Sequence, residues 1–110
     1  MKQDSSDIPI ACRLSSAEFH AREAKLLARF LLAVSGTEEL PDGYGFRIPG
    51  DEKSIAVVAE LIVAERECCR FLTFELAAQP NRGPVLLRGT GPPGTKDFLK
   101  TTFCKREGSF

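Results

Sequence analysis

The sequence predicts one α+β domain of two layers, in which helices cover mainly one face of a mixed β-sheet. Its length, 110 residues, is ordinary for one domain and too short for two. Hydrophobic residues make up 43% of the chain, which is enough for one core without disulfides or a structural metal. Stretches with a period of two also alternate with stretches of helical period, in the order β-α-β-α-β-β-α.

The first half of the chain predicts a strand followed by a helix. Residues 1–7 are polar and predict a flexible N-terminal tail. In the stretch 8–14 apolar residues alternate with others, and an internal proline favours a short strand at a sheet edge. Ser15 and Glu18 then form a capping box that starts a helix, and apolar residues at helical spacing continue it until Gly36 ends it.

The second half predicts three strands and two helices. Alternation resumes in residues 44–48, after a turn-forming segment, and indicates a second strand. We expect the longest helix from about residue 52 to residue 70. Strands at 71–78 and 84–90 follow and are joined as a hairpin. A short helix that starts near Thr95 completes the domain.

The predicted domain spans residues 8–104, and a C-terminal tail follows at 105–110. Lysine plus arginine equals aspartate plus glutamate, at 15 each, so the chain lacks the excess positive charge that binds nucleic acids or acidic membranes. The polar N-terminus is unlike a signal peptide, and no stretch is apolar enough to span a bilayer. We expect a cytoplasmic protein with reduced cysteines and with neither nucleic-acid nor membrane partners.

The longest predicted helix carries a distinctive set of side chains on one side. At about 100° per residue, its apolar residues and its two cysteines fall together. They are Val58, Leu61, Ile62, Cys68 and Cys69. Glu65 falls near the centre of this side, whereas Glu60 and Glu67 fall on the opposite side, which faces solvent. The sequence therefore predicts that Glu65 is buried.

A buried carboxylate requires compensation, because an isolated buried charge costs several kcal/mol or is neutralised by protonation. One interpretation is a structural salt bridge between Glu65 and Arg22 or Arg29 of the first helix. The other is a carboxylate that acts beside the thiols, as a metal ligand or a proton acceptor. In either case we predict a basic or thiol partner within hydrogen-bonding reach of Glu65.

The first helix offers a second group of polar side chains on its apolar side. His20 and Glu23 are three residues apart, so they share a helix face and could bind one ion. The alternative is that the first two turns protrude beyond the sheet and leave both groups solvated.

Cys68 and Cys69 are the most distinctive local feature. Adjacent cysteines form a disulfide only through a strained ring, so in the cytoplasm we expect two free thiols. Neighbouring thiolates chelate soft ions, and Cys12, Cys104 or Glu65 could supply further ligands. The alternative is inert packing, since cysteine is often buried as a small hydrophobic residue.

The segment Glu65-Arg-Glu-Cys-Cys-Arg-Phe-Leu-Thr-Phe-Glu-Leu76 and the stretch 83–92 after it resemble a group of small bacterial proteins of uncharacterised function. Those proteins share a Glu-Arg-x-Cys-Cys-x-Phe pattern and are associated with heavy-metal resistance. The resemblance covers about the last half of the chain. It implies that Glu65, Cys68 and Cys69 form the signature of the group, and it implies no established activity.

Other catalytic motifs receive no support from the sequence. His20 is the single histidine, so a serine or cysteine nucleophile has little choice of base. The glycine-rich stretch 89–96 differs from a phosphate-binding loop, because Thr95 separates Gly94 from Lys96 and no serine or threonine follows the lysine.

These observations favour a small cytoplasmic protein that binds or senses a soft metal or metalloid ion (Zn, Cu or Hg). Cys68 and Cys69 would be the ligands, and Glu65 would orient or complete the site. The alternatives are a non-catalytic interaction module in which the cysteine pair is structural, and an enzyme that acts on a small molecule with Glu65 and a thiol.

Overall fold

The computed structural model describes residues 17–102, apart from the side chains of Phe19, His20 and Cys68. The predicted strand at 8–14, Ser15 of the predicted capping box and the two predicted tails lie outside these residues. The elements follow the order α1 (Ala17–Ala33), β1 (Gly36–Leu40), β2 (Gly43–Ile48), α2 (Glu52–Cys68), β3 (Thr73–Ala78), β4 (Val85–Thr90) and α3 (Thr95–Thr102). Within this part of the chain, no helix has the length and apolar character needed to cross a membrane.

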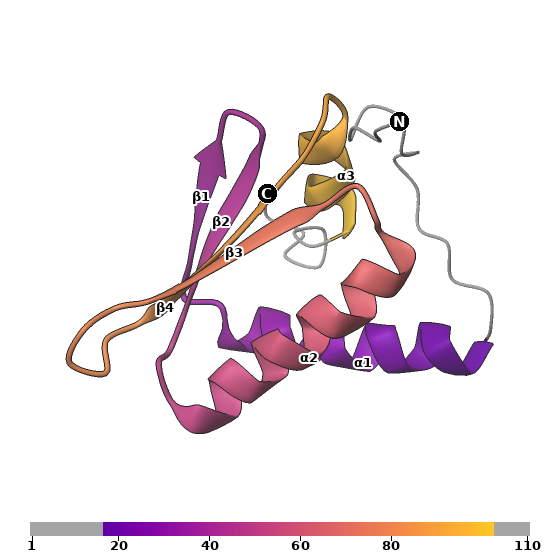
Figure 1. The fold of residues 1–110 in the computed structure, drawn as a ribbon. Coiled ribbons are helices and arrows are strands. Elements are labelled where there is room, and N and C mark those ends of the chain that lie inside the picture. The colour runs from indigo at the N-terminus through magenta and orange to yellow at the C-terminus, as the bar shows by residue number, and fades with distance from the viewer. Residues whose placement is uncertain (1–16, 103–110) are drawn as a thin grey trace, which may run out of the picture.

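The strands form one sheet in the order β1-β2-β4-β3, and every neighbouring pair is antiparallel. Figure 1 shows α1 and α2 together on one side of this sheet, so the predicted α+β class with helices mainly on one face is confirmed. The prediction of a mixed sheet is wrong for the described strands. Two of the three pairs are hairpins, whose strands must be antiparallel, and β2 and β4 also pair in that sense.

The strand β1 is the element that the sequence pattern does not reveal. Its residues are mostly polar and exposed, so the apolar alternation that marks a strand is missing. It forms because its backbone pairs with β2, where Thr37 lies opposite Phe46 and Glu38 lies opposite Gly45. The described part of the chain therefore begins with a helix and a hairpin.

The unit αββ occurs twice, as α1-β1-β2 and as α2-β3-β4. The sheet order has the same symmetry, with β2 and β4 in the centre and β1 and β3 at the edges. Both α1 and α2 have 17 residues, and several of their buried positions correspond. Leu26 and Leu61 are buried at the same distance from the helix start, and so are Phe30 and Glu65. A position that holds a core aromatic ring in the first unit therefore holds a carboxyl group in the second.

The core lies between the sheet and the helices and comprises Leu26, Phe30, Leu31, Phe46, Ile48, Val58, Leu61, Ala64, Leu87 and Leu99. Phe30 of α1 packs edge-on against Phe46 of β2, with 5.4 Å between ring centroids. Phe71, which follows α2, packs edge-on against Phe98 of α3 at 5.0 Å. Aromatic pairs of this geometry add to the free energy of area burial. They fix α1 to the sheet and the end of α2 to α3.

The start of α2 is capped by Asp51, whose backbone is extended (φ −87°, ψ 163°). One carboxylate oxygen accepts a hydrogen bond from the Ser54 backbone N–H at 3.1 Å, and the other accepts one from the Ser54 hydroxyl at 2.7 Å. The first bond gives a partner to the Ser54 N–H, which has none within the first turn of the helix. Both bonds hold the pKa of Asp51 below its ordinary value.

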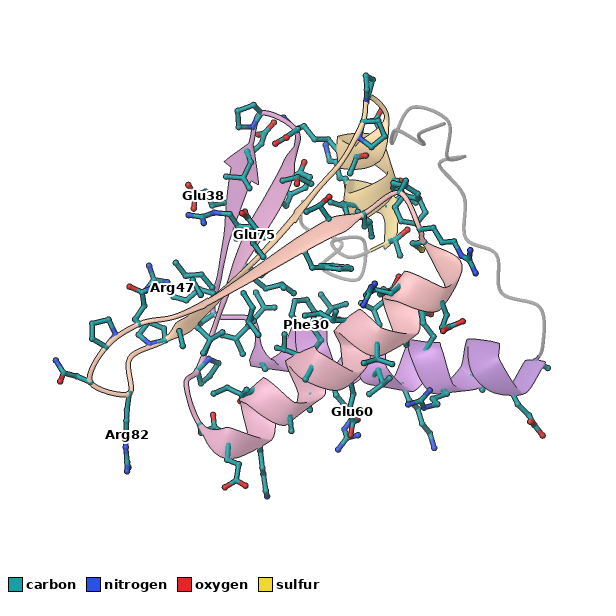
Figure 2. The ribbon with its side chains drawn as sticks, in the orientation of Figure 1. Phe30, Glu38, Arg47, Glu60, Glu75 and Arg82 are labelled. Atoms are coloured by element: carbon teal, nitrogen blue, oxygen red, sulfur yellow. The ribbon has the colours of Figure 1, made fainter. Side chains whose placement is uncertain are left out.

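The β3–β4 hairpin turns through Asn81 and Arg82, which both have positive φ angles (60° and 57°). The Gly83 N–H donates to the Pro80 carbonyl at 3.0 Å and closes the turn, and Figure 2 shows the Arg82 side chain pointing away from its tip. Positive φ at both central residues is the requirement of a type I′ turn, which prefers glycine at the second. We expect Arg82→Gly to raise the free energy of unfolding by about 0.5–1 kcal/mol, measured by urea denaturation.

Arg82→Ala is the matched control for this prediction. It removes the same side chain but keeps the steric cost of a positive φ, so stability should stay close to that of the original protein. If alanine stabilises the hairpin as much as glycine does, the loss of the arginine side chain and not the backbone angle is the cause.

Candidate functional site

The end of α2 and the turn into β3 place the predicted site residues together. Cys68 is the last residue of the helix and Cys69 is its cap (φ −114°, ψ 75°), so the backbone leaves the helix at Cys69. The Cys69 N–H donates to the Glu65 carbonyl at 2.6 Å and closes the last helical turn. The Leu72 N–H donates to the Cys69 carbonyl at 3.3 Å, and β3 begins directly afterwards at Thr73. The helix therefore ends before the predicted boundary, and the cysteine pair lies across that end.

Glu65 is fully buried, with 0% of its surface exposed. Glu60 and Glu67 of the same helix are exposed, and Figure 2 shows Glu60 pointing away from the sheet. The predicted orientation of the helix is therefore confirmed. Because a buried carboxyl group loses the solvation of its ionised form, the charge of Glu65 depends on the protein groups around it.

Cys69 carries a thiol that is outside any disulfide, and the residue is 1% exposed. It lies one helical turn after Glu65, which places the two side chains on the same buried side. Cys68 adjoins Cys69 in the chain, but its side chain is not among those described, and Cys12 and Cys104 lie outside the described residues. Among the side chains that the structure does describe, no three histidine, cysteine, aspartate or glutamate groups are placed to hold a metal ion.

A hollow of about 340 Å³ adjoins the thiol and is lined by Arg66, Cys69, Arg70 and Leu72. Both arginines are exposed, whereas the cysteine forms part of the inner wall. The two guanidinium groups favour a thiolate, and the C-terminal end of the helix dipole disfavours one, each by about 1 kcal/mol or less at such positions. The hollow is therefore a positively charged entrance to a buried thiol.

The second predicted pair, His20 and Glu23, is only partly tested. Glu23 is buried, at 7% exposure, so the alternative in which it is solvated is wrong. The side chain of His20 is not among those described. Arg22 and Arg29, the bases considered as partners for Glu65, are both exposed.

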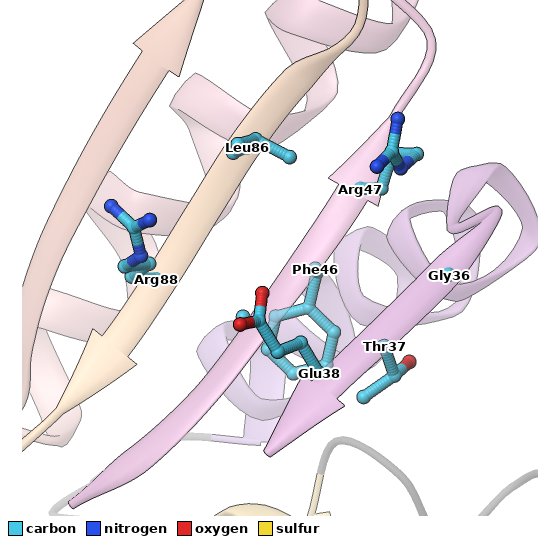
Figure 3. Close-up of a pocket in the computed structure, with 8 residues that line it drawn as sticks. Gly36, Thr37, Glu38, Phe46, Arg47, Leu86 and Arg88 are labelled. Atoms are coloured by element: carbon cyan, nitrogen blue, oxygen red, sulfur yellow. The ribbon is translucent and has the colours of Figure 1, made fainter. Parts of the chain in front are cut away.

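The face of the sheet opposite the helices carries a second hollow, of about 200 Å³, which Figure 3 shows. It lies over Gly45, whose neighbours on the adjoining strands are Glu38 and Arg88. Arg47 borders it farther along β2. Within the described residues, neither arginine side chain forms an ion pair. The sequence could not reveal this hollow, since it depends on which residues the strand register places side by side.

The glycine-proline loop before α3 does not present its lysine to a ligand. Lys96 forms an ion pair with Glu39 of β1, which raises the pKa of Lys96 and lowers the pKa of Glu39. Gly94 has a positive φ of 101°, which a glycine adopts without strain. The loop is a turn that starts a helix and attaches it to the sheet.

No protein family model, no curated protein and no solved structure matches this chain. The resemblance to proteins with a Glu-Arg-x-Cys-Cys-x-Phe segment therefore stays an expectation.

Proposed function

We propose that this protein binds a soft metal or metalloid ion through the thiols of Cys68 and Cys69. The observation that carries the proposal is a buried carboxyl group in the last turns of α2 and a buried thiol at the cap that follows the helix. A second cysteine adjoins the thiol in the chain. The position of α1 that corresponds to Glu65 is occupied by Phe30.

The chemistry of the residues fits soft ions better than hard ones. Thiolates select Cu⁺, Hg²⁺ and Zn²⁺, whereas carboxylates alone would favour Mg²⁺ or Ca²⁺. An ion of low coordination number needs little beyond two thiolates. Tetrahedral Zn²⁺ needs further ligands, for which Glu65 and the distant cysteines Cys12 and Cys104 are the candidates.

The hollow beside Cys69 supplies the route for the ion, and its two arginines supply the charge compensation. Arg66 and Arg70 stabilise thiolate anions before the ion arrives. Glu65 accepts a proton or coordinates the ion as the thiols lose their protons. Binding must release protons, so affinity rises with pH until both thiols are deprotonated.

The test is a titration of the reduced full-length protein with Cu⁺, Hg²⁺ and Zn²⁺, monitored by thiolate-to-metal absorption. Loss of a group behind the ligands typically costs about 10–100-fold in metal affinity, so Cys68→Ser and Cys69→Ser should each cost at least about 100-fold. Cys104→Ser is the matched control for Cu⁺ and Hg²⁺, which need little beyond two thiolates, and should leave the affinity for these two ions within about threefold.

Two outcomes would contradict the proposal. The three serine variants could bind all ions alike, or neither adjacent thiol could react with a small alkylating reagent in the native protein. Either result would favour a non-catalytic interaction module with a structural cysteine pair. The 1% exposure of Cys69 is the observation that favours this second candidate.

A further inference from the structure

Among the described strands β3 is an edge of the sheet, and its own residues lack the features that usually protect an edge. It pairs with β4 in an unbroken register, from Thr73 opposite Thr90 to Ala78 opposite Val85, without a bulge. Its sequence, Thr-Phe-Glu-Leu-Ala-Ala, contains no proline or lysine and a single charged residue. Proteins normally blunt exposed edges with such residues, because the open N–H and C=O groups attract another strand.

The opposite edge differs from β3 in this respect. The strand β1 carries two adjacent carboxylates, Glu38 and Glu39, and Glu39 is held by the ion pair with Lys96 of α3. Figure 1 shows β1 and β3 on opposite margins of the sheet. Among the described residues, charge and an ion pair with α3 therefore protect the β1 edge, whereas β3 has a single charged residue.

An apolar side chain in the middle of β3 is left uncovered. Leu76 lies opposite Leu87, which is fully buried, so both point to the helix side of the sheet. Leu76 is nevertheless 44% exposed. A second strand beside β3 would cover it.

We propose that two copies of this chain associate through β3, with the strands antiparallel and a twofold axis passing through Leu76. Leu76 then lies opposite Leu76 of the second copy, and Glu75 lies opposite Ala77 of the second copy. Paired residues must point to the same face of a sheet, which excludes axes that pass between residues. An axis through Glu75 would place two carboxylates opposite each other, which is unfavourable.

The result is one continuous antiparallel sheet across two molecules, with the helices of both on the same side. This interface is independent of the thiol site, since none of its paired residues lines the hollow at Cys69. The partner is identified by its own strand, because the pairing of Leu76 with itself and of Glu75 with an alanine is self-complementary.

The register gives a sharp test by sedimentation equilibrium of the full-length protein over a range of concentrations. Ala77→Lys places a lysine opposite Glu75 of the second copy, twice per dimer, whereas Ala77→Glu places a carboxylate there. Two such pairs correspond to a roughly two- to thirtyfold change in the dimer dissociation constant, tighter for lysine and weaker for glutamate. Leu76→Ser should weaken the dimer as well, because it removes the apolar contact at the axis.

Matched controls lie on the opposite edge. Thr37→Lys and Thr37→Glu change charge on β1 and should leave the dissociation constant unchanged, and circular dichroism of every variant shows whether the monomer is folded. A folded protein that sediments as a monomer at all concentrations would overturn the proposal, including the case in which residues 8–14 of the same chain cover β3. Equal effects of lysine and glutamate at Ala77 would also overturn it.

Discussion

Gly43→Ala should reduce the free energy of unfolding by about 3 kcal/mol or more, the upper end of what overpacking costs. Gly43 starts β2, and a Cβ atom there would lie 1.8 Å from the carbonyl oxygen of Gly89 and 2.8 Å from the Cα of Thr90. These are backbone atoms of the neighbouring central strand, so no side chain can move aside. The central pair of strands would have to separate, and urea denaturation would show the loss.

Gly45→Ala, two residues along the same strand, is the matched control. A Cβ at Gly45 would meet only side-chain atoms at 3.7–3.9 Å, which is ordinary contact. Removing a glycine also reduces the conformational entropy of the unfolded chain, so the change should lie within about 1 kcal/mol of zero. Equal losses for the two alanines would show that glycine is needed for the strand in general, and the close approach of Gly43 to Gly89 would not be the cause.

The elements of this fold could be predicted where side-chain periodicity is strong. The helix α2 and the strands β2, β3 and β4 have clear alternation or helical spacing, and they occur close to the predicted residues. The strand β1 could not be found, because Gly36-Thr-Glu-Glu-Leu40 pairs through its backbone and buries little of its side chains. The antiparallel order also depends on contacts between distant segments, which local patterns do not report.

The candidate site, like the fold, could be predicted from the sequence only in part. The burial of Glu65 follows from the constant rotation of an α-helix, about 100° per residue, which places Glu65 among the apolar residues of α2. The hollow beside Cys69 does not follow from it, because it depends on where the helix stops and how the chain turns into β3. The correspondence between Phe30 and Glu65 also needed the structure, since the two αββ units share no visible repeat in sequence.

Glu65→Gln should reduce the free energy of unfolding by about 1–3 kcal/mol. The substitution keeps the volume of a side chain that is completely buried, so no cavity forms. It replaces one carboxyl oxygen, an acceptor, with an NH2 group that carries two N–H donors. The surroundings of Glu65 are adapted to a carboxyl group. A buried donor that finds no acceptor has this cost, which urea denaturation at neutral pH measures.

Glu67→Gln is the matched control, because it makes the same chemical change two residues later on the exposed side of α2. Surface substitutions usually change stability by less than about 0.5 kcal/mol, and we expect that result here. If Glu65→Gln also leaves the free energy of unfolding unchanged, the native carboxyl group is already protonated and an amide replaces it without loss of stability. Binding of Hg²⁺ by the same variant then separates the two roles of the residue. An unchanged affinity would restrict Glu65 to the core, whereas a loss of about 10–100-fold would place it behind the thiols as a group that orients or completes the site.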